Sequence, residues 1–325
     1  MQGQKTRKIL EENKLILAPM EAVNCTAFRL LCKQYGAGWV YSPMIYADSV
    51  VALSKELGES EAVKKLVNPL KQESPLSIQI GGRDPEKMKF AAEVMSKHCD
   101  FVDINFGCPV NNILGCKAGG YFSKHPDFFM EKVIPGMIEA SKVPISAKIR
   151  IGWDENTINA VSVCKKFEEI GIESVAIHGR TVQQMYRSGH RWDIIRECKD
   201  AVNIPIIANG NVQKASHVIT CLGQTKADGI MIARAAQDNP MIFTEGNRIL
   251  KEGADGFVEK EPDRKKLFFE FLELYKKYEF RYKFTEIRDH ALWFSKGAVG
   301  STLIRPKLIQ CQNEEELVEL FEREI

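Results

Sequence analysis

Eight short apolar runs, rich in β-branched residues, recur along the first part of the chain, and segments with helical spacing separate them. The runs cover residues 15–17, 38–41, 76–80, 101–104, 145–149, 174–177, 205–208 and 229–232. Apolar strands that alternate with helices are typical of a parallel sheet that is buried on both faces. Eight such units in series favour a closed (β/α)8 TIM barrel over an open sheet. The pattern therefore predicts an α/β fold with its active site at one mouth of a barrel.

The spacing becomes purely helical after Phe243. Residues 264–307 hold eleven Lys and Arg against five Asp and Glu, whereas residues 308–325 hold six Glu and one Arg. A basic helical face beside a barrel mouth is suited to hold RNA phosphates through a salt-sensitive attraction. We therefore predict two domains, a catalytic barrel over residues 1–245 and a smaller helical, RNA-binding domain over residues 246–325.

Composition narrows the class of protein. The chain has 325 residues, of which 44% are hydrophobic, and a formal net charge of only +2, so a polyanionic partner must meet a local patch. Its nine cysteines include no CxxC pair, which argues against a metal site and a disulfide framework and for a reducing compartment. The charged N-terminal segment lacks the apolar stretch of a signal peptide, and no apolar run approaches the roughly 18 residues of a membrane helix. We expect a soluble cytoplasmic protein.

The residues that end the eight runs decide what the mouth can bind, because active sites of such barrels form at the carboxyl ends of the strands. The ends read APM (18–20), SP (42–43), QIGG (79–82), NFGCP (105–109), KIRIGW (148–153), HGRT (178–181), NGN (209–211) and ARAA (233–236). The last two occupy the place where barrels commonly hold a phosphate group. Lys148, with Gln79 and His178 nearby, suits a flat ring that gains negative charge on reduction. These ends predict a phosphate-tailed redox cofactor.

Six longer segments follow one another along the chain: LAPMEAVNCTAFR, INFGCPVNNILGCKAGG, VPISAKIRIGW, VAIHGRTVQQMY, IPIIANGNV and ADGIMIARAAQDNPMIF. Together they resemble the successive motifs of the tRNA-dihydrouridine synthases, a family of FMN-containing (β/α)8 enzymes with a helical C-terminal domain. The resemblance implies that NADPH reduces the flavin. It also implies that FMN is held by Pro19, Met20, Gln79, Lys148, His178, Asn209, Gly210, Asn211, Ala233 and Arg234.

The stretch DINFGCPVNNILGCKAGG, at residues 103–120, carries the expected chemistry. Reduction of the C5=C6 bond of uracil needs a hydride at C6 and a proton at C5, and a thiol with an ordinary pKa of about 8.5 can give that proton at neutral pH. Cys108 matches the catalytic acid of the family. The resemblance further implies that Asn105 hydrogen-bonds the uracil and that Tyr186 contacts the base or its ribose. Arg288, in the segment RDHALWFSKG, is the best candidate for contact with the RNA.

We therefore predict an oxidoreductase that reduces specific uridines of tRNA to 5,6-dihydrouridine, with FMN as cofactor, NADPH as reductant and no obligatory protein partner. One alternative is a flavin barrel that acts on a free pyrimidine, in the manner of dihydroorotate dehydrogenases, which needs no basic tail. The other is an RNA-binding protein without catalysis, which needs no Cys108. We expect no catalytic part for Cys116 or for four histidines, His98, His125, His190 and His217.

Overall fold

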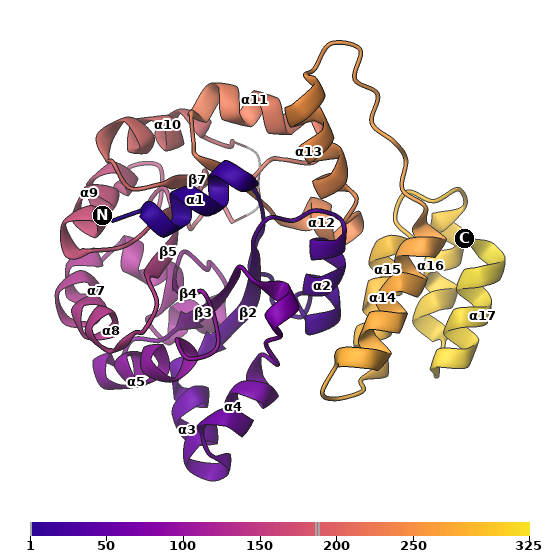
Figure 1. Cartoon of the computed structure of the whole chain (residues 1–325), viewed down its shortest axis with the longest axis horizontal. Helices are drawn as coiled ribbons and strands as arrows, with labels where there is room; N and C mark the ends of the chain where they lie inside the picture. The colour runs from indigo at the N-terminus through magenta and orange to yellow at the C-terminus, as the bar shows by residue number, and fades with distance from the viewer. Residues whose placement is uncertain (1, 186, 188) are drawn as a thin grey trace.

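The computed structural model describes residues 2–185, 187 and 189–325. Its centre is a parallel sheet in the order β1-β8-β7-β6-β5-β4-β3-β2 (Figure 1). The strands are β1 (Leu15–Leu17), β2 (Val40–Tyr46), β3 (Leu76–Gly81), β4 (Phe101–Phe106), β5 (Ile145–Arg150), β6 (Val175–His178), β7 (Ile206–Asn209) and β8 (Gly229–Ile232). The cylinder closes between β1 and β2, where the Leu17 N–H donates to the Trp39 carbonyl at 2.8 Å. The predicted (β/α)8 barrel is confirmed.

All eight predicted runs form strands, but several strands continue past the predicted end. Strand β2 runs on to Tyr46, β4 to Phe106 and β5 to Arg150. Because successive side chains of a strand point to opposite faces, a polar residue that faces the barrel interior does not interrupt the hydrogen-bonded ladder. Asn105, expected just after a strand, therefore belongs to β4 and pairs in register with Lys148 of β5.

Helices surround the sheet. They include α2 (Thr26–Gln34), α5 (Pro85–Met95), α9 (Ala160–Ile170), α10 (Trp192–Ala201) and α11 (Ser216–Thr225). The segment between β4 and β5 holds two further helices, α7 (Pro126–Lys132) and α8 (Ile134–Ala140), which are divided at Val133. Pro135 lies in the first turn of α8, where a residue without an N–H loses no helical hydrogen bond.

Several elements were not anticipated from the sequence. Helix α1 (Gln4–Glu12) closes the amino-terminal end of the barrel, where its Leu10 packs in one cluster with Ile16, Trp39 and Phe101. Two helices, α3 (Ala47–Leu57) and α4 (Glu59–Leu66), follow β2 and project from the barrel in Figure 1. Short elements complete the loops: η1 (Lys71–Glu73), α6 (Asn111–Gly115), η2 (Gly119–Ser123) and α12 (Arg234–Asp238).

The C-terminal part of the chain is helical. Helix α13 (Ile242–Glu252) packs against α11 and β1, so it runs across the expected boundary at residue 245 and stays with the barrel. Four helices follow: α14 (Arg264–Tyr278), α15 (Phe284–Phe294), α16 (Ser301–Gln310) and α17 (Glu314–Glu324). They form a separate group beside α2 and α12 in Figure 1. In the part of the chain that the structure describes, no helix is long and apolar enough to cross a bilayer.

Candidate active site

Polar side chains lie in register on neighbouring strands at the carboxyl end of the barrel. Asn105 of β4 pairs with Lys148 of β5, and Arg150 of β5 pairs with His178 of β6. His178 in turn pairs with Asn209 of β7. Since paired strands lie about 4.8 Å apart, these residues share one mouth. The structure thus brings together the predicted residues of four separate segments.

The mouth concentrates positive charge. Burial lowers the pKa of Lys148 to about 8, and the nearby Arg150 charge acts in the same direction. Burial also lowers the pKa of Arg180, and the Arg234 charge adds to that effect. No hydrogen bond or ion pair joins Lys148 to another described residue. Cations that repel one another in this way fit an anionic ligand. Arg150 and Arg180 were not predicted as site residues, although each lies at a polar strand end.

Two histidines face each other beside these cations. The rings of His178 and His190 have centroids 5.9 Å apart. Burial lowers the pKa of both, that of His190 to about 4, so both rings are neutral at pH 7. His190 Nε2 lies 3.2 Å from the Asn209 carbonyl and donates to it, which leaves the buried Nδ1 without a partner among the described residues. No sequence pattern placed His190 here, because it belongs to a loop without regular spacing.

Hydrogen bonds to Asn105, Gly120 and Arg150 hold the loop that carries Cys108. Asn105 Oδ1 accepts from the Cys108 N–H at 3.0 Å, and the Cys108 carbonyl accepts from the Gly120 N–H at 2.9 Å. Arg150 Nε donates to the Gly107 carbonyl at 3.0 Å. A Cβ at Gly107 would lie only 2.9 Å from the backbone of Ile149, so the loop needs glycine to approach β5 this closely.

The Cys108 thiol is half-buried at this mouth. Burial raises its pKa above the ordinary value, although the Lys148 and Arg150 charges oppose the shift. The group therefore remains a protonated thiol at neutral pH, which is the form that can give a proton.

Backbone groups at the ends of β7 and β8 complete the mouth. Gly210 and Asn211 both have left-handed backbone, with φ of +110° and +62°. A Cβ at Gly210 would lie 2.3 Å from His190 Nε2, so no larger residue fits there. Successive N–H groups in such a turn form a concave anion site. Together with Ala233 and Arg234 at the start of α12, they fit a phosphate group.

The remaining predicted residues lie in other settings. Pro19 and Met20 are half-buried in the turn after β1, where the Met20 carbonyl accepts from the Asn24 N–H at 3.3 Å. Tyr186 lies outside the described residues. Arg288 is half-buried on α15 and donates to the Ile309 carbonyl of α16 at 3.3 Å. This contact ties two helices together, and the contact of Arg288 with RNA stays a prediction.

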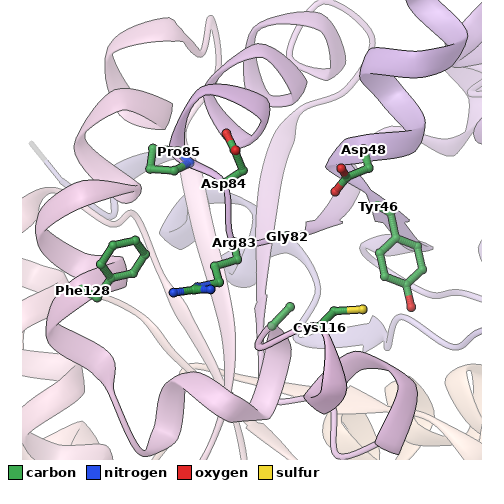
Figure 2. Close-up of a pocket in the computed structure, with 9 residues that line it drawn as sticks. Tyr46, Asp48, Gly82, Arg83, Asp84, Pro85, Cys116 and Phe128 are labelled. Atoms are coloured by element: carbon green, nitrogen blue, oxygen red, sulfur yellow. The ribbon is translucent and has the colours of Figure 1, made fainter.

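A cavity of about 360 Å³ adjoins the loop of Cys108 (Figure 2). It is lined by residues at or after the ends of β2, β3 and β4, among them Tyr46, Arg83 and Cys116. Arg83 points toward the ring of Phe128, with its guanidinium carbon 5.6 Å from the ring centroid. Cys116 lines this cavity, and none of the predicted cofactor residues does.

The basic helical segment is partly neutralised by the rest of the chain. Lys276 pairs with Glu314, and Lys307 lies 3.7 Å from Glu324, so the acidic helix α17 covers part of the charge. Arg281 instead lines a second cavity, of about 370 Å³, between the barrel and the turn from α14 to α15. Lys64 and Lys65 of α4 line the same cavity.

Comparison with known proteins identifies the family. A family model described as Dihydrouridine synthase (Dus) matches residues 16–325, which is nearly the whole chain. The chain belongs to the dihydrouridine synthase family. Among its relatives, the probable tRNA-dihydrouridine synthase of Aquifex aeolicus is 32% identical over 96% of both chains. The tRNA-dihydrouridine synthase B of Vibrio vulnificus is 36% identical over 74% of this chain and 73% of its own length.

A more distant likeness concerns the fold alone. Histamine dehydrogenase from Rhizobium sp. 4-9 superposes with a TM-score of 0.51 at 10% sequence identity. The match covers 81% of this dihydrouridine synthase family member, which spans about half, 49%, of that longer chain. The shared part agrees with the barrel described above.

Proposed function

We propose that this protein reduces uridines of tRNA to 5,6-dihydrouridine. One observation carries the proposal: in a chain of the dihydrouridine synthase family, a protonated thiol, Cys108, and a half-buried cation, Lys148, lie on adjacent strand ends at one mouth. The relatives named above are tRNA-dihydrouridine synthases, which supports tRNA as the substrate. Nine unpaired cysteines fit action in a reducing, cytoplasmic setting.

We propose FMN as the cofactor and NADPH as its reductant. The excess of positive charge around Lys148 fits a ring that becomes electron-rich on reduction, and the left-handed Gly210–Asn211 turn fits its phosphate tail. His178 of β6 stands between these two parts, Gln79 of β3 lies on the other side of Lys148, and Arg234 and Ala233 border the phosphate end. When bound, the flavin supplies a hydride for C6 of the uracil.

The residues of the chain supply the remaining parts of the reaction. Cys108 gives its proton to C5, and its raised pKa keeps that proton in place until the base arrives. Asn105, whose side chain is almost fully buried, orients the base by hydrogen bonding. Lys148 stabilises the negative charge that reduction leaves on the cofactor ring.

Contacts with the rest of the tRNA must offset the free energy of turning the target uridine out of its stack, about a few kcal/mol. We propose that the basic side chains of the second cavity, Lys64, Lys65 and Arg281, take part in this binding. Tyr186 and Arg288 remain the candidates for contacts nearer the base and on the helical part.

The proposal is tested with the purified full-length protein. Its visible spectrum is recorded, and it is then incubated with NADPH and tRNA transcribed without modification, after which dihydrouridine is measured by mass spectrometry. We expect a yellow protein that forms dihydrouridine. A colourless protein without activity would instead support the RNA-binding alternative, and turnover of a free pyrimidine by a variant lacking residues 253–325 would support the dihydroorotate dehydrogenase-like one.

A further inference from the structure

A chain of four hydrogen-bonded groups runs from the barrel interior to Cys108. It starts at Asp103 of β4, which is fully buried and whose Oδ2 accepts from Gln79 Nε2 at 2.8 Å. Gln79 Oε1 accepts from Asn105 Nδ2 at 2.8 Å. Asn105 Oδ1 then accepts from the N–H groups of Gly107 and Cys108 at 3.3 and 3.0 Å. We call this chain the amide relay.

The polarity of the amide relay is set by its two ends. An ionised carboxylate can only accept hydrogen bonds, so Asp103 requires the NH₂ group of Gln79 to face it. The backbone N–H groups at the other end can only donate, so they require the oxygen of Asn105. Each amide between them must then point its oxygen toward the loop and its nitrogen toward Asp103. The second oxygen of Asp103 is also occupied, because Ser146 Oγ donates to it at 2.6 Å.

The orientation of Asn105 determines what the base meets. An amide NH₂ group has two hydrogens, and Asn105 Nδ2 uses one of them on Gln79. No other described residue accepts from this nitrogen, so its second hydrogen is available to a ligand at the mouth. A donor at this place matches a carbonyl oxygen of uracil. A reversed amide would offer an acceptor instead, and it would also oppose the Cys108 N–H.

We propose that Asp103 is a positioning residue that fixes, through Gln79, both the loop of Cys108 and the donor that Asn105 offers to a base carbonyl. The part that concerns the base rests on the proposed function, whereas the part that concerns the thiol does not. The family resemblance assigns Cys108 and Asn105, and this inference adds the buried group that orients them.

The first test removes one end of the relay. Asp103→Leu keeps the approximate size of the side chain but removes both acceptor oxygens, so the NH₂ group of Gln79 loses its partner and its amide is free to reverse. The double variant Asp103→Asn with Gln79→Glu instead preserves the hydrogen-bond pattern, with the carboxylate moved to position 79. The carboxylate introduced at position 79 would accept both from the new amide at position 103 and from Asn105, so the relay keeps one carboxylate. Ser146→Ala is the matched control, since it removes a bond to Asp103 without changing the polarity.

The first readout is the rate at which iodoacetamide alkylates Cys108 in the purified full-length protein. Peptide mass spectrometry measures this rate. The exposed Cys116, outside the relay, serves as the internal reference. We expect Asp103→Leu to raise the rate ratio of Cys108 to Cys116 about fivefold, the effect of one net hydrogen bond. The double variant and Ser146→Ala should stay within about twofold of the natural protein. An unchanged ratio in Asp103→Leu, or an equally raised ratio in Ser146→Ala, would overturn the proposal.

The second readout is dihydrouridine formation. We expect Asp103→Leu to lower kcat while KM for tRNA stays unchanged, and the double variant to exceed Asp103→Leu in kcat. If Asp103→Leu does not fold, the double variant decides alone: a normal alkylation ratio supports the relay, and a raised ratio refutes it. Because alkylation needs no RNA, a protein that reduces no tRNA would still report on Asp103, so the two proposals can fail separately.

Discussion

Asn105 and Lys148 are paired in register across β4 and β5, and this pairing places the loop of Cys108 beside a half-buried cation. The Lys148 charge opposes the rise in the pKa of the Cys108 thiol that burial causes, and the thiolate form of Cys108 would in turn raise the pKa of Lys148. The electrostatics of the proton donor and of the proposed cofactor site are therefore coupled.

Replacement of Cys108 by alanine should abolish dihydrouridine formation, because the proton for C5 then has no positioned donor. General acid catalysis is worth about 10²- to 10⁴-fold in rate, and we expect a loss in that range. Bound flavin, measured from the visible spectrum, should stay at the level of the natural protein. Cys116→Ala is the control and should keep full activity; equal losses in both variants would remove Cys108 as the donor.

Replacement of Lys148 by methionine should weaken flavin binding, because methionine keeps the length of the side chain and removes its charge. A hydrogen bond to a charged group contributes about 1.5–3 kcal/mol, which corresponds to a dissociation constant at least about tenfold higher. Fluorescence titration of the stripped protein with FMN measures it. Lys142→Ala, an exposed lysine just before the same strand, should leave the affinity unchanged.

Flavin affinity should fall as the pH rises through about 8. The pKa of Lys148 is lowered to about 8, so the cationic form is present below that pH and is lost above it. The raised pKa of Cys108 keeps the thiol protonated over the same interval. Lys148→Arg, which stays charged at every accessible pH, should show a flat affinity up to about pH 10. A fall near pH 8 in that variant too would assign the titration to another group.

Raising the salt concentration should weaken tRNA binding steeply, because each neutralised phosphate releases counterions. Arg281→Ala should reduce the slope of log affinity against log salt by about one. Lys307→Ala, whose partner Glu324 already offsets its charge, should leave the slope unchanged. Filter binding over a range of salt concentrations measures both, and equal slopes in all three proteins would contradict a role for Arg281.

Replacement of Glu73 by alanine should destabilise the fold by about 3–5 kcal/mol, because it leaves the Arg29 guanidinium buried without its carboxylate. The pair is 2.7 Å long, and both side chains are almost completely buried. Urea unfolding measures the loss. Glu139→Ala, which breaks an exposed ion pair with Lys89, should leave the midpoint unchanged. A loss under about 1 kcal/mol in the Glu73 variant would show that water or other groups replace the carboxylate.

Much of the site could be predicted because its residues stand at strand ends, which local patterns locate. Lys148, His178 and Asn209 were found in this way, and the structure places them in register. Asp103 could also have been predicted, because side chains of a strand alternate between its two faces and Asp103 and Asn105 therefore lie on the same face of β4. His190 could not, because its place against His178 depends on how a loop folds over the barrel.

The sequence by itself determined the barrel, its closed order of strands and the thiol at the end of β4, because strand propensity and alternation act between residues close in the chain. Only the tertiary structure decided which charges remain unpaired. Lys276 and Glu314 lie 38 positions apart, and no local pattern shows that they meet. The orientation of Asn105 was likewise decided by Asp103 through Gln79, which precedes Asp103 by 24 positions. Hydrogen-bond polarity passes through contacts in space and not along the chain.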